Sequence, residues 1–209
     1  MDFKIKDCYF MSLGTNCAFL KINAKRIPGP VDNVECSKVA YIEHLIKKTY
    51  LKEIVTANLK PDYFEYDHFD KHLKKQHKKV LNHKDLGLYF AHVSYDSKFI
   101  KNQVIRLQNF YNFCDKVNQE ENYYFLLSLF SYSQYKLINY LDIKDILIKY
   151  NLMEKTIVFG PDDYKSYFQN YIVVPYDNAN DDTFKNNTAF ISQFFENNQS
   201  SYIKDLFKN

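Results

Sequence analysis

Four short apolar runs, separated by helical patterns, constrain the fold of this chain most strongly. Each is rich in aromatic or β-branched residues and precedes turn-forming residues, as is typical of a buried strand; the runs are Cys8–Leu13, Tyr123–Phe130, Thr156–Phe159 and Tyr171–Val174. Apolar residues recur at helical spacing in 134–150 and again from Asp182, where Asp182 or Thr183 can cap a helix. Strands that alternate with helices predict right-handed βαβ units. The sequence therefore predicts an α/β fold with three layers and an open, mostly parallel sheet.

The segment from about 34 to 98 interrupts this alternation. It begins with a helical pattern over Ser37–Tyr50 and then becomes rich in His, Lys, Asp and Tyr. We expect a basic, largely helical insertion between the first strand–helix unit and the later strands. It would cover the carboxyl ends of the strands, where open α/β folds bind their ligands. A length of 209 residues suits a single α/β domain, 1–209.

Composition argues against several classes of protein. The 28 basic residues nearly match the 25 acidic ones, so nothing in the charge calls for a nucleic-acid partner. The four cysteines, Cys8, Cys17, Cys36 and Cys114, form no closely spaced pair and are expected to be reduced thiols. The charged first residues do not resemble a signal peptide, and no window reaches the roughly 18 apolar residues of a membrane span. We expect a cytoplasmic protein.

The first apolar run ends in the motif Ser12-Leu13-Gly14-Thr15-Asn16-Cys17, and an amphipathic pattern starts at Ala18. This order predicts a strand, a tight turn and a helix, with Cys17 at the N-terminus of the helix. The positive end of the helix dipole favours a thiolate, which is the nucleophile of cysteine-based acyl chemistry. Backbone N–H groups of the turn, at Gly14, Thr15 and Asn16, would form the oxyanion hole. The alternative is a buried cysteine beside an ordinary glycine turn.

A nucleophilic cysteine needs a base nearby in space. Among six histidines, His92 is the best candidate because it lies in the apolar segment Leu86–Val93, although a histidine there can also be a core residue. Asp32 follows a rigid loop that contains two prolines, so it could orient the histidine or cap the helix near Ser37.

Two further features concern binding. Arg106 lies beside the apolar face of the helical segment 101–113, where it could bridge to Asp32, hold a substrate carboxylate or phosphate, or be an ordinary surface residue. His68 and His72 have the spacing of a zinc pair, but the surrounding lysines would repel a cation. We therefore expect a solvated basic helix over Asp67–Lys79, which attracts anions, and no metal site.

These motifs together resemble a bacterial family of papain-like cysteine peptidases. Its opening Ser-Leu-Gly-x-x-Cys motif is matched by Ser12, Leu13, Gly14 and Cys17. Of its Pro-Phe-Asp-Trp motif, Pro30 and Asp32 remain. Its apolar run ending in histidine matches Phe90-Ala91-His92, and its basic helix keeps Arg106. The resemblance covers about residues 7–130 and implies a cysteine hydrolase.

The chain is also similar, more distantly, to coenzyme-A-binding acetyltransferases of capsule biosynthesis. These carry a strand followed by a Gly-Asn-Cys-Gln turn, which Gly14-Thr15-Asn16-Cys17 matches with one inserted residue, while Ala18 replaces the glutamine. This resemblance implies coenzyme A as a cofactor and surface-polysaccharide biosynthesis as the setting. The alternation of strands and helices agrees with it better than with a papain architecture.

We therefore expect a cysteine-dependent acyl-transfer enzyme, either a hydrolase or an acyltransferase, that acts on a small acyl, thioester or glycan substrate. Cys17 is the expected nucleophile, His92 the base and Asp32 the residue that orients it. Ser12 and Arg106 are expected to bind substrate. The alternative is a non-catalytic module that binds an anionic glycan or a nucleotide through the basic helix expected over Asp67–Lys79 and through Arg106.

Overall fold

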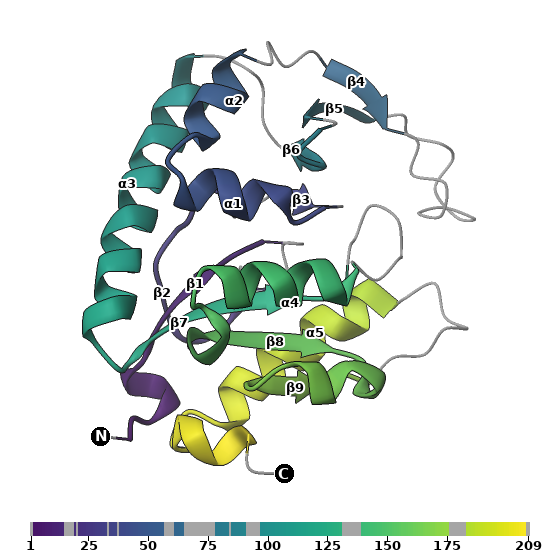
Figure 1. Cartoon of the computed structure of the whole chain (residues 1–209). Coiled ribbons are helices and arrows are strands. Elements are labelled where there is room, and N and C mark those ends of the chain that lie inside the picture. Colours follow the sequence, from purple (N-terminus) through teal and green to yellow (C-terminus); the bar gives the residue numbers. More distant parts are fainter. Residues whose placement is uncertain are drawn as a thin grey trace.

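A five-stranded, all-parallel sheet forms the centre of the molecule (Figure 1). The computed structural model describes residues 2–14, 19, 21–32, 34–36, 38–56, 61–64, 78–83, 85–90, 97–130, 139–175 and 183–207. The strands of this sheet are β1 (Tyr9–Ser12), β2 (Lys25–Arg26), β7 (Tyr123–Ser128), β8 (Thr156–Gly160) and β9 (Tyr171–Val173), in the order β2-β1-β7-β8-β9. Four of them coincide with the four apolar runs.

Side chains alternate between two hydrophobic cores, one on each face of this sheet. In β1, Phe10 belongs to one core and Met11 to the other, and Leu126 and Leu127 divide in the same way in β7. Both faces of the strands are therefore covered. This explains why the strands read as continuous apolar runs rather than as alternating patterns.

Helices pack on both faces. The Met11 core contains residues of α1 (Ala40–Ile46), α2 (Tyr50–Thr56), α3 (Ser97–Gln119) and α4 (Tyr140–Lys149). The Phe10 core contains residues of α5 (Thr183–Asn197) and of the short 3-10 helices η1 (Ile5–Asp7) and η5 (Ile203–Phe207). Two further 3-10 helices, η3 (Met153–Lys155) and η4 (Asp162–Tyr167), flank β8. The prediction of a three-layer α/β fold is confirmed.

The insertion is less helical than the sequence predicts. Besides α1 and α2 it holds an antiparallel sheet of β3 (Glu35–Cys36), β4 (Pro61–Phe64), β5 (Lys78–His83) and β6 (Leu88–Phe90), in the order β3-β6-β5-β4. Antiparallel strands can leave one face in water, so they need no continuous apolar run, and such strands are harder to recognise in the sequence. Lys78 and Lys79 belong to β5 and not to a basic helix. The rest of the expected helix, with His68, His72 and His77, lies outside the described residues.

The helix expected directly after β1 is also different. Residues 13–24 connect β1 to β2, and the described part of this connection beyond Gly14, namely Phe19 and 21–24, holds 3-10 and bend geometry rather than an α-helix. A connection of about a dozen residues between parallel strands is near the minimum length, which leaves little room for a long helix.

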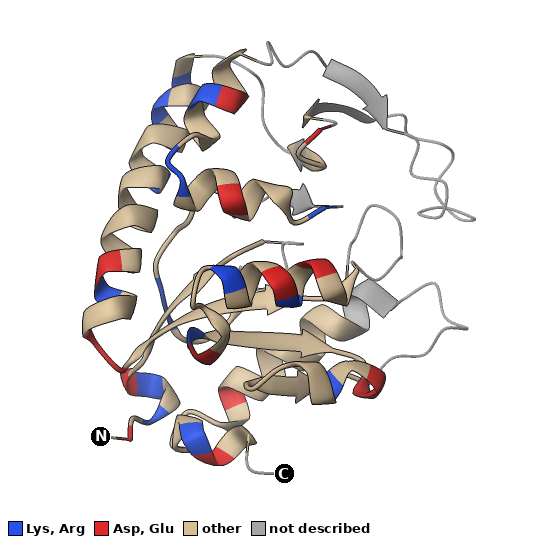
Figure 2. Ribbon diagram, viewed as in Figure 1, with Lys and Arg blue, Asp and Glu red and all other residues tan. Residues whose placement is uncertain are grey.

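Charges are mixed on the described surface. Figure 2 shows acidic and basic residues interspersed along α4, without a stripe of one sign on that helix. Within the described ranges, no helix combines the length and the hydropathy that a membrane crossing requires.

Candidate functional site

The order of the parallel strands identifies one edge of the sheet as the candidate site. β1 lies between β2, which follows it in the chain, and β7, which follows the insertion. From β1 the chain goes first to β2 on one side and later to β7 on the other. The strand order therefore reverses between the carboxyl ends of β1 and β7. In open α/β sheets, ligands bind outside the carboxyl ends of the strands at such a switch point.

The end of β1 is a tightly held turn. The Gly14 N–H donates to the buried Ser12 Oγ at 2.9 Å, and the Leu13 N–H donates to the Leu126 carbonyl at 2.8 Å. The Tyr41 hydroxyl of α1 donates to the Leu13 carbonyl, so the insertion is anchored directly to this turn. Gly14 has a φ of 103°, a conformation that side chains with a Cβ rarely adopt. The glycine of the motif is thus required by the backbone, and the observed contact of Ser12 is with the turn itself.

The neighbouring strand ends in the same way. Ser128, fully buried at the end of β7, accepts a hydrogen bond from the Phe130 N–H at 3.2 Å. Two serines at adjacent strand ends therefore organise the backbone that leaves the sheet at the switch point.

The Asp32 side chain lies buried in an ion pair. Its Oδ2 accepts from Arg26 Nη1 at 2.6 Å and from the Gly29 N–H at 2.9 Å, and 2% of the side chain is exposed. The suggestion that Asp32 caps the helix near Ser37 is wrong, because α1 begins at Ala40 and its N-cap position, Val39, makes no side-chain cap. The carboxylate holds its own loop instead.

Arg106 does contact Asp32, as one of the sequence hypotheses suggests, but through the backbone. Arg106 Nη1 donates to the Asp32 carbonyl at 3.0 Å, and Asn109 of the same helix donates to the Pro28 carbonyl at 3.1 Å. Helix α3 thus fixes the loop at two points.

This loop lies against the carboxyl end of β1. A Cβ built on Gly29 would be 3.1 Å from Met11 Cγ and 3.5 Å from the Ser12 carbonyl oxygen. Asp32, Arg26 and Arg106 are therefore brought to the same edge as the Ser12–Gly14 turn. Sequence reasoning missed Arg26; the available signal was a basic residue six positions before a loop aspartate.

Four of the expected site residues, Thr15, Asn16, Cys17 and His92, lie outside the described residues. The structure describes their neighbours, Gly14 and Phe19 around the first three and Phe90 at the end of β6 before the last.

Cys8 and Cys114 are two cysteines of this fold whose surroundings do not activate the thiol. Burial, together with nearby Asp7 and Asp2, raises the pKa of Cys8 to about 12. Burial and nearby Asp115 raise the pKa of Cys114 to about 12. Both remain protonated at neutral pH and are poor nucleophiles. They are therefore internal references for the reactivity of Cys17.

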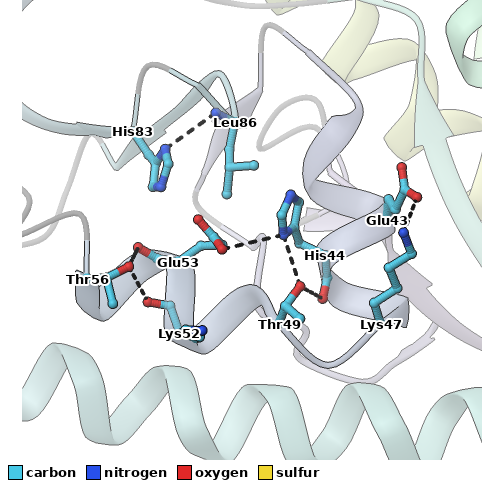
Figure 3. Close-up of polar contacts among 9 residues, drawn as sticks. All are labelled: Glu43, His44, Lys47, Thr49, Lys52, Glu53, Thr56, His83 and Leu86. Atoms are coloured by element: carbon cyan, nitrogen blue, oxygen red, sulfur yellow. Dashed lines mark hydrogen bonds and ion pairs between the residues drawn. The ribbon is translucent and has the colours of Figure 1, made fainter.

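A separate polar group lies in the insertion (Figure 3). His44 Nδ1 is 2.9 Å from Thr49 Oγ1 and 4.0 Å from Glu53 Oε1, and the buried His83 accepts from the Leu86 N–H at 3.4 Å. Among the residues that the structure describes, no three His, Cys, Asp or Glu side chains are grouped so that they could hold a metal ion. These contacts hold α1, α2 and the β5–β6 turn in their local conformations.

No protein family model, no curated protein and no solved structure matches this chain.

Proposed function

We propose that this chain is a cysteine-dependent acyl-transfer enzyme in which Cys17 is the nucleophile and His92 the general base. One observation supports this most directly. The Ser12–Gly14 turn ends β1 at the switch point of the parallel sheet, and Cys17 follows Gly14 by three residues. We therefore expect a thiol three residues after this turn to lie near the edge where such folds bind ligands.

In the proposed reaction, His92 accepts the Cys17 proton and the thiolate attacks the carbonyl carbon of an acyl donor. A carbon–sulfur bond forms, and backbone N–H groups of the Gly14–Cys17 turn stabilise the oxyanion. The intermediate collapses, the bond to the leaving group breaks, and the imidazolium returns its proton to that group. Water or an acceptor hydroxyl, deprotonated by His92, then attacks the acyl-cysteine and regenerates the thiol.

Asp32 enters this proposal in one of two ways. It orients His92, or it acts as a positioning residue that holds the loop beside β1 through Arg26 and Gly29. The pH profile of the rate separates these roles. Loss of an orienting carboxylate changes the apparent pKa of the base, whereas a loosened loop lowers the rate at every pH.

The proposed substrates follow from the resemblance and from the chemistry. A thiol nucleophile suits an activated acyl donor such as a coenzyme A thioester, and the acceptor would be water or a glycan hydroxyl of surface-polysaccharide biosynthesis. Acetyl-coenzyme A is the probe, and release of the free coenzyme A thiol is the readout.

The first experiment measures how fast each cysteine reacts with iodoacetamide in the native protein at neutral pH, by peptide mass spectrometry. We expect Cys17 to be alkylated much faster than Cys8 and Cys114, whose pKa values are raised to about 12. Alkylation of Cys17 should abolish release of coenzyme A, and Cys17→Ala should lack this activity while Cys114→Ser keeps it. Equal reactivity of Cys17 and Cys114 contradicts the proposal.

A second candidate function is a non-catalytic module that binds an anionic glycan or a nucleotide. It is favoured by Arg106, a cation that α3 brings to the switch-point edge and whose contact with Asp32 is to an uncharged backbone carbonyl. This function predicts that Cys17→Ala binds such a ligand as well as the natural chain does and that no acyl donor is turned over. Turnover that depends on Cys17 excludes it.

A further inference from the structure

Helix α5 carries two polar side chains whose buried atoms are unpaired. Asn187 is 2% exposed, and neither its Oδ1 nor its Nδ2 has a hydrogen-bond partner among the described residues. The hydroxyl oxygen of Thr188, the next residue, is also buried without a partner there. Buried polar groups are nearly always paired, and an unpaired one destabilises the fold. Three such atoms on adjacent residues therefore indicate that something else binds them.

Asn187 lies on the face of α5 that packs against the parallel sheet. It precedes Ile191 and Phe195 at intervals of four residues, and these two belong to the core on that face. The Phe195 ring lies 5.2 Å from the Phe10 ring of β1 and 6.1 Å from the Phe159 ring of β8. Asn187 thus continues a core stripe by one more turn, but with an amide in place of an apolar side chain.

That extra turn leads towards the carboxyl edge of the sheet. α5 follows β9 in the chain, and Figure 1 shows it beginning on the side to which β7 and β8 point. Further along the helix, Ser192 Oγ donates to the Lys21 carbonyl at 3.1 Å, and Gln199 donates to the Asn23 carbonyl. α5 therefore runs beside the segment that leads away from the Ser12–Gly14 turn. Going back along α5 from Ser192 to Asn187 leads towards that turn.

The amide also lies close to the start of the helix. Side chains on a helix lean towards its N-terminus, so the Asn187 amide covers the turn that begins at Thr183. The first N–H groups of a helix have no acceptor within the helix, and the dipole there favours an anion. Phosphate groups bind at such positions in α/β folds.

We propose that Asn187, Thr188 and the first turn of α5 bind the phosphate and an adjoining hydroxyl of a sugar phosphate or a nucleotide. The Asn187 NH₂ group, the Thr188 hydroxyl and the helix N–H groups donate to phosphate oxygens. The Asn187 carbonyl oxygen needs a donor, which a phosphate dianion lacks and a sugar hydroxyl supplies. This site does not depend on whether Cys17 reacts.

The test is isothermal titration calorimetry of the full chain with glucose 1-phosphate, ADP and inorganic phosphate. We expect one of the two esters to bind more tightly than inorganic phosphate; which of them does so distinguishes a sugar phosphate from a nucleotide. Asn187→Leu should weaken binding about tenfold or more, because it removes hydrogen bonds to the ligand. Its thermal midpoint should stay the same or rise, because the variant also removes an unpaired buried amide. Thr188→Val should weaken binding without unfolding the chain.

Asn197→Ala is the matched control, since Asn197 is exposed at the other end of α5. It should bind the ester as the natural chain does, and so should Cys17→Ala even if that variant loses all acyl transfer. Failure of every phosphate-bearing probe to bind overturns the inference, and so does an Asn187→Leu variant that is more stable but binds unchanged. If Asn187→Leu does not fold, Thr188→Val decides in the same way.

Discussion

Arg106 in α3 donates a hydrogen bond of 3.0 Å to the backbone carbonyl of Asp32, a residue 74 positions earlier in the chain. The carboxylate of the same aspartate binds Arg26 at the end of β2. One residue thus connects a long helix on one face of the sheet to a strand at its edge, and both contacts lie beside the carboxyl end of β1.

Replacing Arg106 with alanine should destabilise the fold by about 1–2 kcal/mol, because the Asp32 carbonyl loses a charged donor. The measurement is the free energy of unfolding in urea. Lys101→Ala, at an exposed position of the same helix, is the control and should change the stability little. An equal loss in both variants would mean that the contact with Asp32 does not contribute to stability.

Asp32→Asn should destabilise the fold more, by about 3 kcal/mol, because it leaves the Arg26 guanidinium without its anion. The double variant Arg26→Met with Asp32→Asn should recover part of this loss, since no unpaired charge remains. A double-mutant cycle measured by urea unfolding gives the coupling energy. Additive single effects would show that the pair is not coupled.

Gly14→Ala should destabilise the fold by about 2 kcal/mol or more. Alanine tolerates the left-handed region poorly, and the Gly14 φ of 103° lies beyond that region, where the strain is greater still. Gly87→Ala is the comparison, since Gly87 has a φ of 63° and alanine can reach that conformation with less strain. Thermal unfolding should therefore show the larger shift for Gly14→Ala. The reverse order would argue against a turn that specifically requires glycine at the end of β1.

Stability in acid should depend on Glu43. Hydrogen bonds from Lys47, Lys149 and the Tyr150 hydroxyl lower the pKa of Glu43 from 4.5 to about 2. Because the folded state holds this group ionised more strongly than the unfolded state does, its contribution is present above pH 4.5 and is lost as the pH falls towards 2.

Thermal midpoints measured between pH 6 and pH 2 should therefore fall less steeply for Glu43→Gln than for the natural chain. Parallel curves for the natural chain and Glu43→Gln would refute the assignment.

The parallel sheet could be predicted from the sequence because its strands are covered on both faces. Strands such as β7 and β8 then need apolar residues at most positions, and a nearly continuous apolar run is visible without an alignment. The antiparallel sheet of the insertion could not be predicted in this way. β5 reads Lys-Lys-Val-Leu-Asn-His, which is neither a continuous apolar run nor a strict alternation, so its composition does not mark it as a strand that pairs with β4 and β6.

The candidate site was predictable in part for a similar reason. The Ser12–Gly14 turn is local, so its residues show both the serine that accepts the N–H and the glycine that permits the backbone. Arg26 and Asn187 were missed because their roles depend on tertiary placement. Arg26 matters through a loop that folds back, and Asn187 through its place on a buried stripe of α5. Neither residue type is distinctive by itself.

The place of β1 in the sheet has a consequence for how the chain acquires its structure during synthesis. Tyr9 of β1 pairs with Tyr123 of β7, so one side of β1 gains its neighbour only after more than a hundred further residues have been synthesised. Until then an apolar segment presents unsatisfied backbone groups, which favour association with other nascent chains. Closing so large a loop also slows folding. A chaperone that binds β1 during synthesis should therefore raise the yield of folded protein more than a chaperone that acts after the chain has left the ribosome.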